Sequence, residues 1–111
     1  MHRVEVERED GTAVVSAAGE LDAYAAPDLA AAFEQVTGED PLIVDLGAVS
    51  FLDSTALGVV VRTIRAVDER RDRARIILPT GAARRIFEIT TLDRALPVAR
   101  DRAEAVASLA D

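Results

Sequence analysis

Apolar and polar residues alternate at the start of the chain, in the pattern of a strand with one buried face. Over Arg3–Glu9 two valines alternate with charged residues, and a period of two places the valines on one side. Asp10-Gly11 is a tight-turn dipeptide, and apolar residues resume over Thr12–Ala18. These two segments predict a β-hairpin.

Helical and strand patterns then follow one another. Pro27 suits the first turn of a helix, a single apolar stripe continues from it, and Gly38 offers a stop. Leu42–Leu46 and Arg75–Leu78 are short apolar runs, as in strands covered on both faces. We expect a loop over Gly47–Asp53 and a helix from Ser54 to Arg70 between these strands.

The last third of the chain predicts two more helices around a brief strand. Ala82–Thr90 is expected to be helical with Ile86 and Ile89 facing inward, and residues 97–99 are expected to form a short strand. Asp101 with Glu104 three residues later resembles a capping box that opens a final helix. The order ββαβαβαβα predicts an α/β fold with a mixed sheet of about four to five strands, packed with about four helices.

Length and composition narrow the functional classes. The 111 residues suit one domain covering the whole chain, 1–111. A net charge of −7 argues against direct binding to nucleic acid or to an anionic membrane, because both need a basic surface. No run approaches the roughly 18–20 apolar residues that span a bilayer, and no signal sequence is visible, so we expect a soluble cytoplasmic protein.

The chain is poor in residues that carry chemistry. It has no Cys, and its one His, His2, is expected at a frayed terminus. Thiolate catalysis, disulfides and cysteine-ligated metals are thereby excluded, and the usual general base is missing. Ser54 follows a strand but lacks the G-x-S-x-G flanks of a nucleophile elbow. We therefore expect no enzyme, no cofactor and no metal.

The segment Asp53-Ser54-Thr55 opens the second helix and has two readings. In the first reading, Asp53 or Ser54 is only a helix N-cap, whose side-chain oxygen accepts a bond from a first-turn N–H. In the second, Ser54 is a phosphoacceptor, because a helix N-terminus at the surface favours an anionic group.

Three separated motifs resemble one family. The first is GELD at residues 19–22 with APDL at 26–29, the second is VDL at 44–46 with FLDSTALGV at 51–59, and the third is LDRALPV at 92–98. In this order along the chain they resemble the STAS domain of bacterial anti-sigma factor antagonists. The resemblance runs from about Val4 to Leu109 and implies the STAS fold.

The resemblance implies a partner-switching regulator. In that family the unphosphorylated antagonist binds an anti-sigma factor that is also a serine kinase, and so controls sigma-factor-dependent transcription. The kinase phosphorylates the serine that corresponds to Ser54, and a serine phosphatase restores it. The alternative is a non-switching STAS interaction subunit, either a stress-signalling scaffold or an accessory protein of a transport ATPase, that is not phosphorylated at Ser54.

Residues around Ser54 are expected to contact the partner. Along the outer face of the helix these are Thr55, Gly58, Val59 and Arg62, while Asp22 and Asp53 either cap local turns or touch the partner. Phe51 and Leu52 are expected in the core.

Two positions depart from the family pattern, where Gly is usual. Ala56 either makes the helix start firmer or hinders a kinase at Ser54, and Thr91 stands at a helix end.

Overall fold

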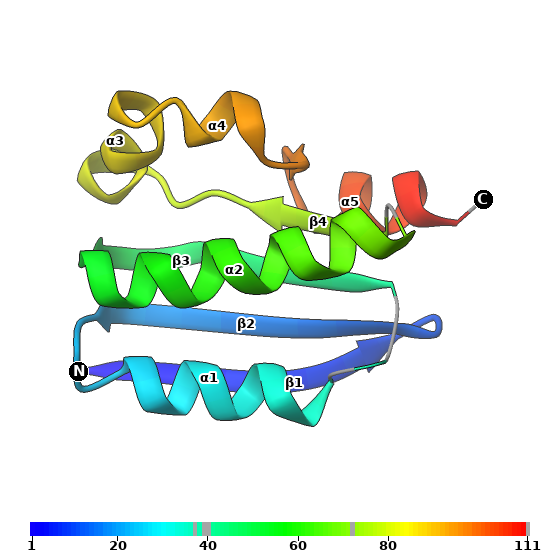
Figure 1. Cartoon of the computed structure of the whole chain (residues 1–111), viewed down its shortest axis with the longest axis horizontal. Coiled ribbons are helices and arrows are strands. Elements are labelled where there is room, and N and C mark those ends of the chain that lie inside the picture. The colour runs from blue at the N-terminus through cyan, green and yellow to red at the C-terminus, as the bar shows by residue number, and fades with distance from the viewer. Residues whose placement is uncertain (37, 39–40, 72, 111) are drawn as a thin grey trace.

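The computed structural model describes residues 1–36, 38, 41–71 and 73–110, and within them it contains one five-stranded sheet and five helices (Figure 1). The sheet order follows the chain. Its strands are β1 (His2–Glu9), β2 (Thr12–Leu21), β3 (Leu42–Leu52), β4 (Ala74–Ile77) and β5 (Val98–Ala99). The helices are α1 (Ala26–Gln35), α2 (Ser54–Arg71), α3 (Gly81–Ile89), α4 (Leu92–Ala95) and α5 (Arg102–Leu109).

The N-terminal hairpin forms as the sequence predicts. β1 pairs antiparallel with β2, and Val6 lies opposite Val15. Asp10 and Gly11 both have positive φ, 52° and 80°, which is the backbone of a tight turn whose twist matches the strands. From β2 to β5 all pairs are parallel, so each connection crosses over the sheet on a helix.

The two faces of the sheet carry cores of different size. The larger core lies under α1, α2 and α3, where Val15, Val44 and Ile76 meet Leu29, Ile64 and Phe87. The smaller core lies under α5 and holds Val14, Ile43, Ile77, Ala99, Ala105 and Leu109. Successive strand residues point to opposite faces, so one run such as Ile43-Val44 supplies both cores.

An ionic cluster helps α5 hold the second face. The Arg102 side chain donates from Nη2 to Asp45 Oδ2 at 2.9 Å and from Nη1 to Glu7 Oε1 at 3.1 Å. Burial disfavours the Arg102 charge, but the hydrogen bonds to Asp45 and Glu7 outweigh it and raise the pKa of Arg102 above its ordinary value. The final helix itself begins at the predicted cap, with Asp101 Oδ1 accepting from Glu104 N at 2.8 Å.

The structure corrects two expectations about elements. Gly47–Asp53 is not a loop, because β3 stays paired with β2 as far as Leu52 opposite Leu21. The pairing has two register shifts, at each of which β3 has one residue more than β2, and these extra residues break the strict alternation by which strands are recognised. A short helix, α4, also precedes β5, and its sequence has no apolar repeat from which a helix could be predicted.

Two side-chain placements are also corrected. Ile89 is 75% exposed, and the buried pair of α3 is Ala83 with Phe87. The spacing of four between Ala83 and Phe87 defines the inward face, and Ile89 falls outside it. His2 is not frayed, since it pairs with Gly19 in the sheet and its Nε2 lies 2.7 Å from Asp28 Oδ2.

Candidate phosphorylation and docking site

The junction between β3 and α2 is built by Asp53. Its Oδ1 accepts a hydrogen bond from Ala56 N at 3.0 Å, and its carbonyl oxygen accepts from Leu57 N at 2.9 Å. Asp53 is therefore the N-cap of α2, as the first reading of this segment predicts. Asp53 N also donates to Leu21 O at 3.1 Å, which ties the junction to the end of β2.

Ser54 is the first residue of α2, and its side chain is exposed. Neither its hydroxyl nor that of its neighbour Thr55, which is also exposed, is engaged in a hydrogen bond with the described residues. The first-turn N–H groups of a helix lack intrahelical acceptors, and the helix dipole makes this end favourable for negative charge. The Ser54 hydroxyl is thus open to another protein, and the local field tolerates an anion there.

Asp22 lies beside this junction, directly after the strand end to which Asp53 is bonded. Its Oδ1 accepts from Tyr24 N at 3.0 Å and from Ala25 N at 3.1 Å. These bonds form the turn that leads into α1, so the capping role expected for Asp22 is confirmed. Asp22 and Asp53 consequently place two carboxylates at the same edge of the sheet as Ser54.

Ala56 is fully buried and packs in the larger core with Val60 and Ile64. Its methyl group therefore points away from the surface on which Ser54 lies. Of the two consequences expected for this departure from the family pattern, burial favours the firmer helix start.

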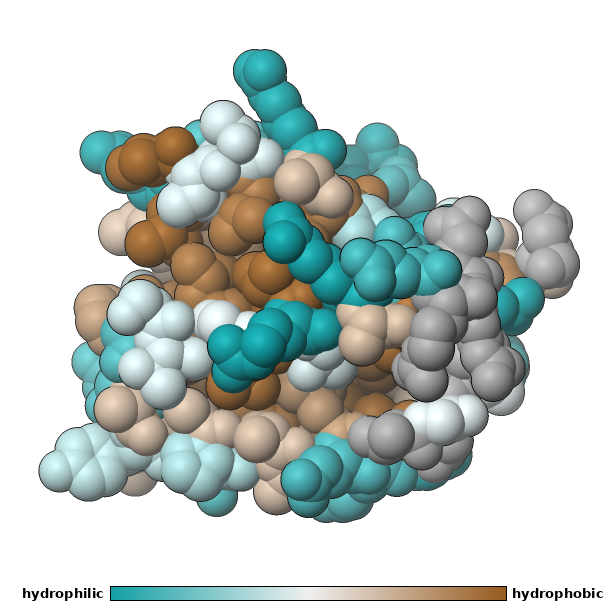
Figure 2. Space-filling model, viewed as in Figure 1, coloured by the Kyte–Doolittle hydropathy of each residue, from teal (hydrophilic) through white to brown (hydrophobic). Residues whose placement is uncertain are grey.

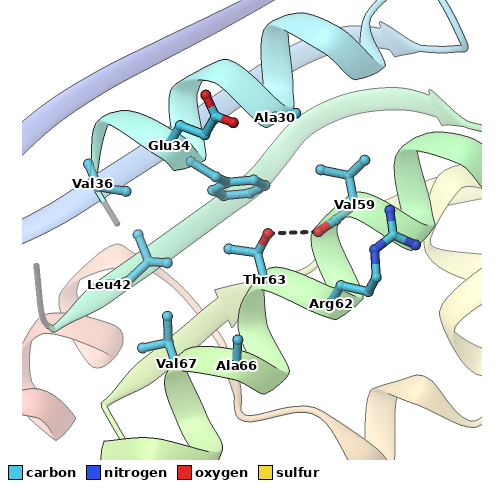
Figure 3. Close-up of a pocket in the computed structure, with 10 residues that line it drawn as sticks. Ala30, Glu34, Val36, Leu42, Val59, Arg62, Thr63, Ala66 and Val67 are labelled. Atoms are coloured by element: carbon cyan, nitrogen blue, oxygen red, sulfur yellow. Dashed lines mark hydrogen bonds between the residues drawn. The ribbon is translucent and has the colours of Figure 1, made fainter. Parts of the chain in front are cut away.

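The outer residues of α2 do not form one continuous face. Val59 and Arg62 line a groove of about 370 Å³ between α1 and α2, whose α1 wall includes Ala30, Phe33 and Glu34 (Figure 3). Val59 also packs against the larger core, so the expectation that it points freely outward is wrong. In the same groove Thr63 Oγ1 donates to Val59 O at 2.8 Å.

Gly58 lies on the ridge of α2, under the side chain of Arg62. A Cβ at Gly58 would lie 3.0 Å from Arg62 Nη1. The missing side chain therefore lets the guanidinium lie close against the helix.

Sequence analysis did not foresee that two aromatic side chains near the site are exposed. Tyr24, after β2, is 88% exposed, and Phe51, the penultimate residue of β3, is 50% exposed, contrary to the core position expected for it. Leu52 is buried as expected. Alternation along β3 could not have revealed the exposure of Phe51, because the register shifts put residues of both parities, Val49 and Leu52, into the same core.

Within the described ranges, no group of three His, Asp or Glu side chains is placed to hold a metal ion. The same part of the chain includes no helix with the length and apolar character needed to cross a membrane.

Comparison with known proteins identifies the family. The family model described as the STAS domain matches residues 3–105. The anti-sigma-B factor antagonist of Listeria monocytogenes is 38% identical over 88 residues, covering 78% of this chain and 77% of that protein.

Solved structures agree. An anti-sigma factor antagonist from Mycobacterium paratuberculosis has a TM-score of 0.86 at 31% identity, covering 100% of this chain and 96% of that one. The Bacillus cell fate determinant SpoIIAA in its phosphorylated form shares the fold, with a TM-score of 0.72 at 23% identity over 96% and 99% of the two chains. The chain therefore belongs to the STAS domain family, and it is similar over most of its length to bacterial anti-sigma factor antagonists.

Proposed function

We propose that this protein is an anti-sigma factor antagonist that switches partners through phosphorylation of Ser54. Unphosphorylated, it binds an anti-sigma factor that is also a serine kinase, and sigma-factor-dependent transcription follows. Phosphorylation of Ser54 releases the antagonist, and a serine phosphatase restores it. The effect on transcription passes through these cytoplasmic proteins rather than through DNA, in line with the net charge of −7.

The exposed Ser54 at the start of a capped helix carries this proposal. The Asp53 cap fixes where α2 begins, so the Ser54 hydroxyl has a defined position at the surface. The three residues Asp53-Ser54-Thr55, at a strand-to-helix junction, correspond to the family motif whose serine is the phosphoacceptor. The Bacillus relative is known in a phosphorylated form.

A phosphate at Ser54 acts through charge. It adds about −1.5 to −2 charges next to the carboxylates of Asp53 and Asp22. Because Ser54 is exposed and Asp53 alone supplies the cap, the added group leaves the fold unchanged and alters only what can dock. The docking contacts include Asp22, Asp53, Thr55, Gly58, Val59 and Arg62.

The test is phosphorylation by the cognate anti-sigma factor. Purified protein is incubated with that kinase and ATP, and its intact mass and phosphorylation site are measured. We expect a gain of one phosphate on Ser54, none in Ser54→Ala, and an unchanged gain in Thr55→Val. Phosphate on Thr55 alone, or none on wild-type protein that does bind the kinase, would instead support the non-switching STAS subunit.

A further inference from the structure

β1 is a long free edge of the sheet (Figure 1). The strand order is β1-β2-β3-β4-β5, so among the described strands only β1 and β5 have a neighbour on one side alone. β5 has two residues, whereas β1 has eight. An edge strand of that length offers a row of backbone N–H and C=O groups to another strand. β1 is therefore the edge at which a further strand can be added.

The backbone groups that point outward belong to the even-numbered residues of β1. Glu20 N donates to Met1 O at 3.0 Å, and the register between the two strands continues without a shift. Because hydrogen-bonded pairs alternate along an antiparallel ladder, the odd-numbered residues of β1 bond to β2. The N–H and C=O groups of His2, Val4 and Val6 are thus directed away from the sheet.

The side chains on the two faces of β1 differ in character. Val4 and Val6 are half-buried against the larger core, on the side where α1 packs. Arg3 and Glu5 lie on the other face, where their side chains are 72% and 63% exposed and approach each other to 3.6 Å. The next two acidic side chains of β1 pair with α5. The start of the strand therefore presents one positive and one negative side chain, two residues apart.

The sequence of β1 is complementary to itself in one antiparallel register. When Val4 lies opposite Val4 of a second copy, Arg3 of each copy lies opposite Glu5 of the other, and the outward backbone groups of the two strands meet. The two neighbouring registers that keep the same faces together set Arg3 against Arg3 or Glu5 against Glu5. Opposite charges across two strands stabilise the pairing and like charges destabilise it. Charge thus selects the register centred on Val4.

The same arrangement brings the α1 helices of the two copies to packing distance. α1 contacts both β1 and β2, so its axis would lie about 4.8 Å, one strand spacing, from the two-fold axis between the copies. The two helix axes would then be about 10 Å apart, which is a spacing at which helices pack. Ala31 is exposed on this flank of α1 and lines a hollow of about 420 Å³ with Val4 and Val6. Its small side chain permits the close approach.

The surface around this edge fits a reversible contact. Figure 2 shows weakly hydrophobic and hydrophilic residues along the lower border of the molecule, where Figure 1 places α1, and strongly hydrophobic surface above it. Small interfaces of mixed polarity belong to transient complexes rather than to obligate ones. α1 also separates β1 from α2 (Figure 1), so pairing at this edge leaves Ser54 uncovered.

We propose that β1 pairs antiparallel with β1 of a second copy, with Val4 opposite Val4, and joins the two sheets into one. The occupant of the free edge is thus the protein itself, recognised by its Arg3 and Glu5. This inference goes beyond the proposed function and does not depend on it, because no residue of the β3–α2 junction takes part.

The test reverses the two charges that face each other. Sedimentation equilibrium at about 0.15 M salt, where distant charges are screened, measures the dissociation constant of the dimer. We expect wild type to dimerise at about 100 μM. Arg3→Glu and Glu5→Arg should each weaken dimerisation about tenfold, because each sets like charges opposite one another at two places. The double variant Arg3→Glu/Glu5→Arg restores opposite charges and should dimerise as wild type does.

Mixing the two single variants tests whether the charges act between copies. Arg3→Glu carries two negative charges at these positions and Glu5→Arg two positive ones, so an equimolar mixture should form a heterodimer at a concentration where each alone is monomeric. Arg94→Glu is the matched control, since it changes the net charge as Arg3→Glu does but lies in α4, where its side chain is exposed. We expect it to change the dissociation constant by less than about twofold.

The inference and the proposed function fail separately. Wild type that stays monomeric at about 500 μM overturns the inference. A dimer that the two reversals leave unchanged also overturns it, since another surface would then join the copies. In both cases phosphorylation of Ser54 still supports the proposed function. A charge-dependent dimer that binds no anti-sigma factor supports the inference and overturns the proposed function alone.

Discussion

The two flanks of α2 differ in how deeply the apolar side chains beside them are buried. On the α1 flank, Phe33 is 5% exposed, and Val59 and Val67 pack against the same core. On the other flank, toward α3, Leu57 and Val61 are half-buried against this core as well, but Ile89 of α3 is 75% exposed. Both flanks of α2 therefore help to hold the fold, and the difference lies in the neighbouring side chains, Phe33 of α1 being buried and Ile89 of α3 exposed.

This contrast separates a side chain that stabilises the fold, Phe33, from one whose apolar area stays in water, Ile89. Buried apolar area stabilises the folded chain, whereas exposed apolar area lowers the free energy only when something covers it. The α1 flank is thus part of the frame that keeps α2 in place. Ile89, beside the other flank, adds little to stability because its side chain is 75% exposed.

The largest expected effect on stability comes from removing the buried side chain of Phe33 on the α1 flank. Phe33→Ala removes a buried ring and should lower the free energy of unfolding by about 3–5 kcal/mol. Ile89→Ala on the other flank should change it by less than about 0.5 kcal/mol, because this side chain is exposed. Urea denaturation followed by circular dichroism measures both. Similar losses in the two variants would contradict the division between the flanks.

Most of the fold could be predicted because its signals are local. The Asp10-Gly11 turn, the Pro27 helix start and the Asp101 cap each need only a few neighbouring residues, and the structure has each where it was expected. The continuation of β3 could not be predicted in this way. It depends on pairing with β2 across two register shifts, and such pairing is a property of two distant segments.

The residues of the candidate site also divide into those that the local sequence predicts and those that it does not. The Asp53 cap was foreseeable, since it acts three residues along the chain. The position of Val59 was not, because this residue lines the groove with α1 only once the crossover has placed α1 beside α2. His2 was misplaced for a similar reason, because its partner Asp28 is 26 residues away.

The second-largest effect on stability is expected at Asp53, where α2 begins. Asp53→Ala removes the α2 cap and should lower the free energy of unfolding by about 1 kcal/mol. Asp53→Asn keeps an oxygen for Ala56 N and should lose only a small part of that, although its charge is gone. Thermal unfolding of both variants distinguishes the hydrogen bond from the charge. Equal losses would show that the carboxylate charge, rather than the cap, stabilises this helix start.

A smaller effect on stability is expected at Gly58, on the outer side of α2 between its two flanks. Gly58→Ala raises helix propensity, which stabilises a helix by up to about 1 kcal/mol. The new methyl group would lie 3.0 Å from Arg62 Nη1, so the guanidinium must move aside and part of that gain is lost. The double variant Gly58→Ala/Arg62→Ala should therefore show a larger gain than the sum of its single variants. If the effects on thermal unfolding were additive, the Arg62 guanidinium would move aside without any loss of stability.

The smallest effect concerns the polar atom inside the α1–α2 groove. Among the described residues, Thr63 Oγ1 bonds only the carbonyl of Val59 on its own helix, and such bonds add little to helix stability. Thr63→Val keeps the shape, so the free energy of unfolding should change by less than about 0.5 kcal/mol while the groove becomes more apolar. If the partner contacts only the rim of this groove, affinity for the anti-sigma factor should also stay within about twofold of wild type. A marked change in affinity at constant stability would show that the partner enters the groove, because Thr63 lines it.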